Sequence, residues 1–450
     1  MENKADVVIC GAGIAGVATA YHLVVHHDLR NVVLVDERPP LTLTSDKSTE
    51  CYRNWWPSQA MTGLMNRSID WLEQLADESD NYFHLNRRGY VYLTANPATA
   101  VSWQQSATAP LRIHEGQSPT YQPAPAHGYR EQPTGADLLL GSELIRAHFP
   151  FVSETAVAAL HVRRAGWLSA QQLGMYLWQQ AREKGARLVN GRLTDIHVAN
   201  GQIQGVTVSS DGRTAAINTG RFVNAAGPFL PEVSAMMGVD LSITNEQHGK
   251  IAIEDPLGII PRDAPLMIWN DPVRLPWTEE EQEYLAEQEA TRWLLEEFPA
   301  GAHFRPEGGP GSQTLLFLWP YHTVQQNPPR WPLHFEPEFA DILLRGMARL
   351  APGLAAYFER MSKPLIDGGY YTRTAENWPL IGPLPVDGAF VVGALSGYGL
   401  MAAPAAGELA AAQIMGAPLP DYASAFLPAR LADPAYWQRV KAGNFEDGQL

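Results

Sequence analysis

The N-terminal segment constrains the fold of this chain more than any other part of it. An apolar run, Val7-Val8-Ile9-Cys10, leads directly into Gly11-Ala12-Gly13-Ile14-Ala15-Gly16, which has the GxGxxG spacing. Small and apolar residues then favour a helix, and a second apolar run, residues 32–35, ends at Asp36. A continuous apolar strand is typical of a parallel sheet that is buried on both faces. The whole order is that of a strand–turn–helix–strand unit that binds a dinucleotide.

Each part of this unit has a separate physical role. We expect Gly11 to permit a tight turn, Gly13 to let a pyrophosphate approach the backbone, and Gly16 to let helix and strand pack closely. The helix N-terminus offers unpaired N–H groups and a positive dipole end to the phosphates. Asp36 can accept hydrogen bonds from ribose hydroxyls. The candidate contacts are Gly11, Ala12, Gly13, Ile14, Ala15, Gly16, Asp36, Glu37 and Arg38.

Composition and charge exclude several classes of protein. The chain has 450 residues, of which 45% are hydrophobic and 18% charged, so a largely disordered chain is excluded. Its net charge of −15 (33 Lys and Arg against 48 Asp and Glu) opposes nucleic-acid binding. Two cysteines, Cys10 and Cys51, exclude a disulfide framework and a CxxC metal site, and no other metal-ligand spacing is present. Without a secretory signal or an apolar membrane span in the sequence, we expect a cytoplasmic protein.

Several later motifs lie in a fixed order along the chain. They are Gly166-Trp167-Leu168 before a helix, Ala225-Ala226-Gly227-Pro228 at a strand end, residues 374–383, and the glycine cluster of residues 393–399. Together with the N-terminal unit they resemble the FAD-dependent D-amino-acid-oxidase-like superfamily, which includes glycine oxidases, sarcosine oxidases and dimethylglycine dehydrogenases. The similarity covers almost the whole chain and is nearest in pattern to sarcosine oxidase-like proteins. Ser169 and Glu376 stand where that family usually carries aspartate.

The resemblance implies an α/β (α+β overall) fold with two domains. One is a Rossmann-like FAD-binding domain with a central parallel sheet and an antiparallel meander, formed by residues 1–85, 150–245 and 366–418. The other is a substrate domain with a mixed or antiparallel sheet and helices, formed by residues 86–149 and 246–365. Residues 419–450 would form a C-terminal tail. The meander is also predicted directly, because residues 188–198, 203–209 and 215–223 alternate and are separated by Asn-Gly or Asp-Gly turns.

The resemblance also implies where FAD is held beyond the N-terminal unit. A polar loop after Asp36 would pass the diphosphate and the flavin, and Lys47 in it is either a cofactor contact or a solvated loop lysine. The backbone N–H groups of Gly399, Leu400 and Met401 would stabilise negative charge on the reduced flavin. The implied contacts are Ser45, Lys47, Ser48, Thr49, Leu193, Ala226, Gly227, Gly393, Gly397, Tyr398, Gly399, Leu400 and Met401.

We expect the flavin to be bound without a covalent link. Sarcosine oxidases carry a flavin-linking cysteine just before the tyrosine matched by Tyr371, whereas here that stretch is Asp367-Gly368-Gly369-Tyr370. Cys51 lies in the flavin loop and is a remote alternative for such a link. The other interpretation of Cys51 is an inert buried thiol.

The substrate side of the site is predicted from two positions. In sarcosine-oxidase-like proteins an arginine at the position of Arg53 binds the substrate carboxylate, which suits a planar guanidinium that donates two parallel hydrogen bonds. A structural ion pair is the competing interpretation of Arg53. Tyr371 stands where D-amino-acid and glycine oxidases carry a carboxylate-binding arginine, and this favours a secondary or tertiary amine.

Other residues are expected around this pocket, each with a structural alternative. The aromatic side chains of Tyr52, Trp55, Trp56 and Trp319 would either wall the pocket and contact an amine by cation–π interaction, or be ordinary core. His322 would accept a proton or orient the substrate, or be a loop histidine without a role. Lys250 is in the region where related oxidases cover the flavin, and a lysine there promotes electron transfer to dioxygen.

The resemblance implies that the chain oxidises a C–N bond of a small amine or N-alkyl amino acid by hydride transfer to flavin N5, giving an imine. Dioxygen or a redox carrier would be the electron acceptor. The alternatives are a FAD-dependent 2-hydroxy-acid or polyol dehydrogenase, a flavin-bearing subunit of a heteromeric amine dehydrogenase, and an NAD-dependent enzyme, since the GxGxxG motif alone does not separate FAD from NAD. A homo-oligomer and a partner subunit both remain open.

Overall fold

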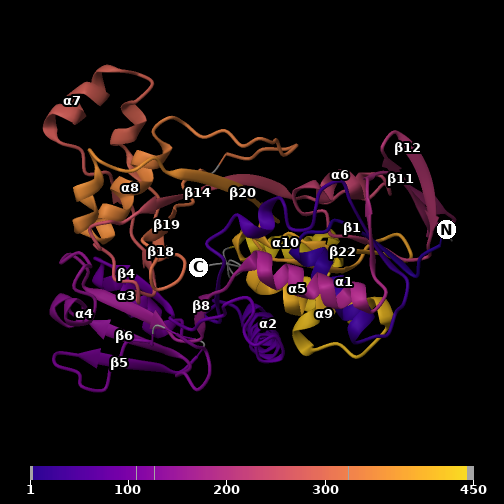
Figure 1. Ribbon diagram of the computed structural model, residues 1–450, viewed down its shortest axis with the longest axis horizontal. Helices are drawn as coiled ribbons and strands as arrows, with labels where there is room; N and C mark the ends of the chain where they lie inside the picture. Colours follow the sequence, from indigo (N-terminus) through magenta and orange to yellow (C-terminus); the bar gives the residue numbers. More distant parts are fainter. Residues whose placement is uncertain (1–3, 108, 126, 323, 443–450) are drawn as a thin grey trace.

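The computed structural model describes residues 4–442 except residues 108, 126 and 323. The chain forms two lobes that are joined by two long strands (Figure 1). One lobe contains helices α1 (Ile14–Val25), α2 (Gln59–Glu78), α5 (Ala170–Glu183) and α9 (Gly399–Met415). The other contains helices α3 (Pro97–Gln105), α4 (Ser142–His148), α7 (Glu279–Glu287) and α8 (Phe339–Leu350). The predicted mixed α/β fold is confirmed.

The first lobe is built on a six-stranded, mainly parallel sheet. Its order is β21 (Leu380–Pro383), β22 (Ala389–Gly393), β13 (Phe222–Asn224), β1 (Val7–Cys10), β2 (Val32–Asp36) and β9 (Arg187–Asn190). Only β21, at one edge, runs antiparallel to its neighbour in this sheet. All four residues of β1 are buried, as expected of a central parallel strand with both faces covered.

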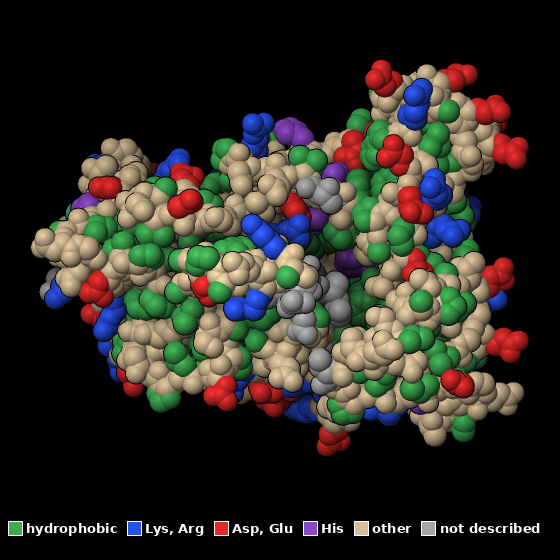
Figure 2. All heavy atoms as spheres, turned by 180° about the vertical axis from the view of Figure 1, so that it is seen from behind, with side chains coloured by type: hydrophobic (Ala, Val, Ile, Leu, Met, Phe, Trp, Pro, Cys, Tyr) green, Lys and Arg blue, Asp and Glu red, His purple; other side chains and the backbone are tan. Residues whose placement is uncertain are grey.

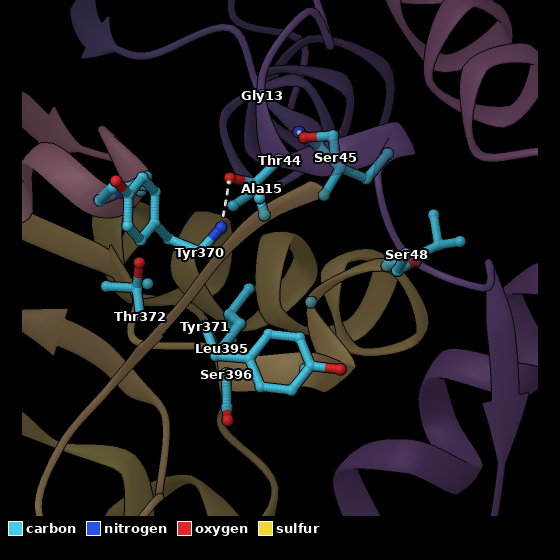
Figure 3. A pocket seen from close by; sticks show the side chains of 18 of the residues that line it. Gly13, Ala15, Thr44, Ser45, Ser48, Tyr370, Tyr371, Thr372, Leu395 and Ser396 are labelled. Atoms are coloured by element: carbon cyan, nitrogen blue, oxygen red, sulfur yellow. Dashed lines mark hydrogen bonds between the residues drawn. The ribbon is translucent and has the colours of Figure 1, made fainter. Parts of the chain in front are cut away.

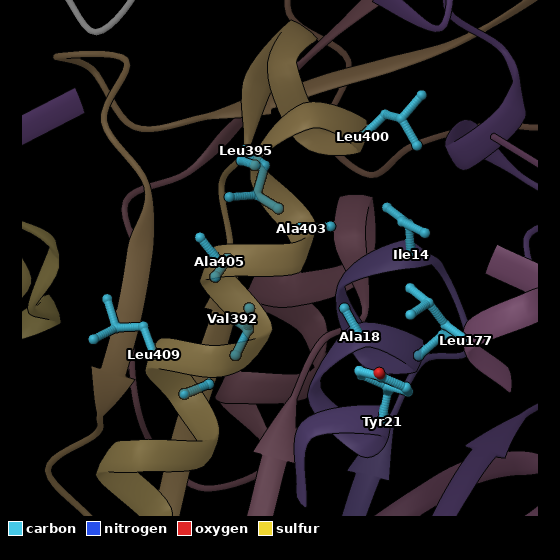
Figure 4. Close-up of a cluster of buried hydrophobic side chains, with 14 of the residues drawn as sticks. Ile14, Ala18, Tyr21, Leu177, Val392, Leu395, Leu400, Ala403, Ala405 and Leu409 are labelled. Atoms are coloured by element: carbon cyan, nitrogen blue, oxygen red, sulfur yellow. The ribbon is translucent and has the colours of Figure 1, made fainter. Parts of the chain in front are cut away.

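Helices α1 and α9 pack closely over this sheet (Figure 4). The close crossing depends on Gly407 of α9, because a Cβ atom there would lie 2.6 Å from the backbone carbon of Ala18 on α1. Ile14, Ala18 and Leu400 belong to one buried apolar cluster with side chains of α2 and α5. The start of α1 and the start of α9, distant in sequence, are thereby fixed next to each other.

The second lobe is built on a nine-stranded mixed sheet. Its order is β20 (Leu365–Arg373), β14 (Thr244–Glu254), β19 (Thr314–Leu318), β18 (Ala302–Pro306), β15 (Leu266–Trp269), β4 (Tyr90–Thr94), β7 (Ala158–Val162), β6 (Ala136–Leu140) and β5 (Leu111–Glu115). β14 and β20 are paired antiparallel from Thr244↔Arg373 to Ala252↔Leu365. They are the two strands that pass from one lobe toward the other (Figure 1).

The sheet differs from the predicted domain boundaries at two places. β7 lies in residues 150–245 and β20 in residues 366–418, the ranges expected for the nucleotide domain, yet both strands belong to the nine-stranded sheet. The reason is pairing, since β7 bonds to β4 and β6 and β20 bonds along the full length of β14. After β7 the chain leaves this sheet at β8 (Ala165–Trp167), which pairs with β3 (Cys51–Arg53), and after β20 it leaves the sheet at β21.

The predicted antiparallel meander is confirmed as β10 (Arg192–Ala199), β11 (Gln202–Ser210) and β12 (Arg213–Asn218). Its turns are Asn200-Gly201 and Asp211-Gly212, and all four residues have positive φ, which is the requirement of tight hairpin turns. The remaining elements with regular structure are α6 (Leu230–Ala235), α10 (Pro434–Lys441), β16 (Val273–Arg274) and β17 (Glu297–Phe298). Within the described residues, no helix has the length and apolar character needed to cross a bilayer. Seen from behind, the surface is hollowed between the two lobes (Figure 2).

Candidate active site

Two cavities that share part of their lining lie at the carboxyl ends of β1, β2 and β13, and together they are called the channel below. The first, of about 1310 Å³, is lined by the predicted residues Gly11, Asp36, Glu37, Arg38, Leu193 and Ala226. The second, of about 840 Å³, is lined by the predicted residues Ile14, Ala15, Lys47, Ser48, Gly393, Gly397, Gly399, Leu400 and Tyr371. Gly13, Thr44, Ser45, Ala225, Gly227 and Pro228 line both cavities. The structure thus brings most of the predicted cofactor residues to one channel.

The glycines of the GxGxxG motif occupy positions where a side chain would collide. Gly11 has a φ of 107°, and a Cβ atom there would lie 2.3 Å from the carbonyl oxygen of Ala225 on the neighbouring chain segment. A Cβ atom on Gly16 would lie 2.0 Å from the carbonyl oxygen of Gly11, so this glycine permits close packing of helix on strand. Gly13 faces the loop, where a Cβ atom would come within 3.2 Å of Ser45 Oγ.

Backbone donors at the start of α1 face the channel. The N-cap residue of this helix is Gly13, which has no side chain that could accept from the first N–H groups. Ile14 N–H donates instead to Ser45 Oγ in the neighbouring loop, at 3.0 Å. Asp36 accepts hydrogen bonds from the backbone N–H of Ala12 (2.8 Å) and of Arg38 (2.9 Å), which fix its carboxylate at the channel wall. A helix start of this kind and a fixed acid at the end of the second strand suit a pyrophosphate and a ribose.

The second cavity lies between the loop of residues 44–48, strand β20 and the start of α9 (Figure 3). Tyr370 N–H bonds to Thr44 Oγ1 at 3.4 Å, which ties the loop to β20. The rings of Tyr370 and Tyr371 point to opposite sides of the strand, and Tyr371 lines the cavity. α9 begins without a side-chain cap among the described residues, and the buried hydroxyl of Ser396 nearby has no described hydrogen-bond partner. Unpaired donors are therefore available on the α9 side of this cavity.

Five predicted cofactor residues do not line the described cavities and serve the surrounding structure. Ala12 donates its backbone N–H to Asp36, and Gly16 packs against the carbonyl oxygen of Gly11. Thr49 accepts a hydrogen bond from Arg305 Nε at 2.6 Å through its carbonyl oxygen. Tyr398 is buried and donates to the carbonyl oxygen of Asn377 at 2.8 Å, and the carbonyl oxygen of Met401 accepts from Ser68 Oγ.

His248, a residue outside the motifs recognised in the sequence, lines the second cavity. Its ring packs on Tyr371 with the centroids 3.8 Å apart, and neither of its nitrogens has a hydrogen-bond partner in the described part of the chain. Nε2 lies 3.8 Å from Glu246 Oε2, and Glu246 in turn binds Arg373. Burial lowers the pKa of His248, while the Glu246 carboxylate opposes that shift. The pKa of Tyr371 is raised to about 12 by burial.

Arg53 is a buried cation that has no carboxylate partner among the described residues. It ends β3, and only 5% of the residue is exposed. Nε donates to the carbonyl oxygen of Trp55 at 3.2 Å, whereas Nη2 has no hydrogen-bond partner and no described acidic side chain lies within ion-pair distance. The guanidinium stacks over Trp56, 4.3 Å from the ring centroid. Arg53 does not itself line either cavity, but its charge acts on Tyr371, whose upward pKa shift it opposes.

The four predicted pocket aromatics are buried, and three of them have a backbone partner for the polar tip. Tyr52 donates to the carbonyl oxygen of Asn86, Trp56 to that of Arg53, and Trp319 to that of Pro299. Trp55 belongs to an apolar cluster under β4, and Trp319 packs against Gly346 of α8. None of the four is among the described residues that line the cavities.

The two predicted lysines and His322 also have defined partners. Lys250 Nζ donates to the carbonyl oxygen of Ser48 at 2.8 Å and so connects β14 to the loop of residues 44–48. Lys47 pairs with Asp367 at 2.9 Å. His322 Nε2 lies 3.0 Å from Glu336 Oε2 and its ring stacks on Phe339. Lys47 is the member of this group found in the described cavity lining.

Comparisons with known proteins find similarities along the chain. The sequence profile of the family described as FAD dependent oxidoreductase matches residues 6–413. Over 250 residues the chain is 26% identical to the mitochondrial dimethylglycine dehydrogenase of Mus musculus, a match that covers 55% of this chain and 26% of that protein. Over 92 residues it is 32% identical to sarcosine oxidase subunit beta of an Arthrobacter species, covering 20% of this chain and 23% of that protein. The chain therefore matches about a quarter of the length of either relative.

The fold has solved counterparts over its whole length. The crystal structure of L-proline dehydrogenase from P. horikoshii has a TM-score of 0.72 at 18% identity, and the alignment covers 98% of this chain and 99% of that one.

Proposed function

This chain belongs to the family of FAD-dependent oxidoreductases, and from that premise we propose that it oxidises a C–N bond of a small amine or N-alkyl amino acid that carries a carboxylate. The residues that line the channel, among them Gly11, Asp36 and Gly399, would hold FAD, which would supply the capacity to accept a hydride from the carbon next to nitrogen and so convert the amine to an imine. The protein contributes position and charge. Its own residues therefore decide which substrate is oxidised.

The observation that carries this proposal is the unpaired guanidinium of Arg53. A buried charge is strongly unfavourable unless a counter-charge and hydrogen bonds satisfy it. Nη2 of Arg53 has no described hydrogen-bond partner. The positive charge of Arg53 acts on Tyr371 in the cavity wall, where it opposes the rise in the pKa of the phenol. A substrate carboxylate would supply both the missing charge and the missing acceptor. Arg53 would then orient the substrate with its amine toward the cavity that Tyr371 and His248 line.

Three further features support an amine substrate and a non-covalent cofactor. The relatives with matching segments are named as a dimethylglycine dehydrogenase and a subunit of a sarcosine oxidase, both of which act on N-methyl amino acids by name. Residues 367–370 contain no cysteine that could link the flavin. Burial raises the pKa of the Cys51 thiol, and this disfavours the thiolate that a covalent link at Cys51 would need. We further propose a cytoplasmic enzyme that passes its electrons to dioxygen or a redox carrier.

The test is reduction of the bound flavin without air. The purified chain should be yellow, and N-methylglycine or another N-alkyl amino acid should bleach its absorption band, whereas 2-hydroxy acids and polyols should not. Bleaching by a 2-hydroxy acid alone would replace this proposal with a hydroxy-acid dehydrogenase. A flavin that no amine bleaches in the isolated chain, but that is bleached when a partner subunit is added, would indicate a subunit of a heteromeric enzyme.

A further inference from the structure

We infer that His248 is the group that removes the proton from the substrate ammonium before the C–N bond is oxidised. The inference rests on the proposed function and adds a catalytic residue to it. An ammonium has no lone pair to assist loss of a hydride from the neighbouring carbon, so a carboxylate-bearing amine, which is protonated near neutral pH, must first lose a proton. A general base inside the cavity makes this step independent of the small fraction of free amine in solution.

The position of His248 follows from the pairing of β14 and β20. His248 lies opposite Gly369, and Glu246, two residues earlier on the same face of β14, lies opposite Tyr371. Gly369 has no side chain, and a Cβ atom there would lie 3.0 Å from Thr44 Cγ2 of the flavin loop. The imidazole therefore packs diagonally across the strands onto the Tyr371 ring, 3.8 Å away between centroids, where both residues line the second cavity.

The hydrogen bonding of His248 is incomplete, as expected of a group that awaits a ligand. His248 is 5% exposed, and neither Nδ1 nor Nε2 has a hydrogen-bond partner in the described chain. Buried polar atoms in folded proteins are nearly always paired. Nε2 is directed to Glu246, with 3.8 Å between Nε2 and Oε2. We assign the proton of the neutral ring to Nε2, which leaves the lone pair of Nδ1 as the acceptor for the substrate N–H.

The charges around His248 suit an imidazole ring that is neutral before the substrate binds and positively charged after it has taken the substrate proton. Burial, His322 and Arg373 lower its pKa, and His303 lies near enough to be affected by it. Glu246 acts in the opposite sense and would stabilise the imidazolium once it forms. Arg373 holds the Glu246 carboxylate, and its own side chain is 35% exposed, so the pair extends from the cavity wall to the surface.

The proton step is balanced within the enzyme and its substrate. The N–H bond of the ammonium breaks, an N–H bond to Nδ1 forms, and the electron pair stays on the amine nitrogen. Substrate charge falls by one and His248 charge rises by one, opposite the Glu246 carboxylate. After the product leaves, the imidazolium releases its proton to water, and the ring is neutral again.

The experiment measures the rate of flavin reduction by N-methylglycine in the holoenzyme without air, between about pH 6 and pH 10. In wild type the rate should reach a plateau above the pKa of His248. In His248→Asn the rate at about pH 7 should fall roughly 100-fold, the usual scale of general-base catalysis, and should then rise about tenfold per pH unit as the free amine becomes available. A His248→Asn rate and pH profile equal to wild type would overturn the inference.

A second variant covers the case in which His248→Asn does not fold. Glu246→Gln keeps a polar partner for Arg373 but removes the charge that stabilises the imidazolium. We expect a lower plateau whose acid edge moves to lower pH, and an unchanged profile would count against His248 as the base. His197→Asn, a change to a half-exposed histidine of the meander, is the matched control and should behave as wild type.

A binding measurement gives a readout that needs no turnover. Acetate should bind the holoenzyme more tightly as the pH falls from about 7 to 5, because a charged His248 attracts an anion, and this pH dependence should vanish in His248→Asn. A pH dependence that persists in the variant contradicts the assignment. If no amine reduces the wild-type flavin, the proposed function fails. If amines reduce wild type and His248→Asn alike, only the present inference fails.

Discussion

Tyr371 packs directly on the backbone of Gly397, so closely that a methyl group on Gly397 would lie 2.5 Å from the phenol Cζ. The contact joins β20, an edge strand of the nine-stranded sheet, to the turn that precedes α9. Both residues line the second cavity. The glycine in this turn is therefore required by the tyrosine above it, since the position carries no positive φ.

Gly397→Ala should weaken FAD binding. The added methyl group must displace the Tyr371 ring or the turn, and overpacking of this kind costs about 1–3 kcal/mol. We expect the dissociation constant of FAD to rise about tenfold, measured by titrating the apoprotein with FAD and following flavin fluorescence. Gly220→Ala is the control, because a Cβ atom there meets open space. Equal FAD affinity in the two variants would show that the close contact between Gly397 and Tyr371 is not needed for FAD binding.

Arg53→Met should impair substrate binding while leaving the flavin in place. Loss of a charged hydrogen bond costs about 1.5–3 kcal/mol, so kcat/KM for an N-methyl amino acid should fall roughly 10- to 100-fold. Arg53→Lys should recover only part of the loss, since an ammonium cannot reproduce two parallel hydrogen bonds. Steady-state kinetics with a carboxylate-bearing amine and with the matching amine lacking the carboxylate will separate the effect. Arg439→Lys, on the exposed face of α10, is the control, and a carboxylate-independent loss would argue against the assigned role of Arg53.

Acid should destabilise the second lobe through His161. This histidine has no solvent exposure, bonds to Tyr121 at 3.0 Å between Nδ1 and Oη, and has a pKa lowered to about 3 by burial and by Arg163. Between about pH 6.5 and pH 3 the unfolded chain therefore binds one more proton here than the folded chain, and stability falls as the pH falls. At about pH 5 the loss is of order 2 kcal/mol.

The measurement for this prediction is the melting temperature of wild type and of His161→Gln as a function of pH. The variant should lose less stability than wild type between pH 7 and pH 5, since it lacks the titrating ring. Parallel curves for the two proteins would mean that His161 does not contribute to the acid sensitivity.

Glu376→Gln should lower the free energy of unfolding, because it weakens the contact between Glu376 and Arg430 near the C-terminus. Glu376 has no exposed side-chain surface and pairs with Arg430 at 2.9 Å, which attaches residues after α9 to the loop before β21. Removing one member of a buried pair costs about 3–5 kcal/mol, because the remaining charge is left unpaired. Urea unfolding should show this loss, whereas Glu297→Gln, in an exposed pair with Arg274, should cost less than about 1 kcal/mol. Similar effects of the two changes would contradict the buried role of Glu376.

The nucleotide half of the site is largely predictable from sequence because its determinants are local. The GxGxxG spacing, the strand before it and Asp36 all lie within residues 7–36, and each has a fixed geometric requirement. The contact of Gly11 with Ala225 is not predictable in this way, since it depends on how two distant strands are paired.

The substrate half is less predictable because residue type does not decide between core and pocket. Tyr52, Trp56 and Trp319 are aromatic in either role, and it takes the structure to show that their polar tips bond to backbone carbonyl groups and that they are absent from the described cavity linings. His248 was missed for a related reason. Its place beside Tyr371 follows from the register of β14 on β20, and the pattern of charged and polar residues at 246, 248 and 250 on one strand face was the available signal.

The uninterrupted ladder between β14 and β20 forms one wall of the second cavity. Both strands cross from lobe to lobe, and β20 carries Gly369 to Thr372 in the cavity wall. A change in the angle between the lobes would have to bend this ribbon of two hydrogen-bonded strands. The wall of the second cavity at residues 369–372 is part of that ribbon, so its position is tied to both lobes.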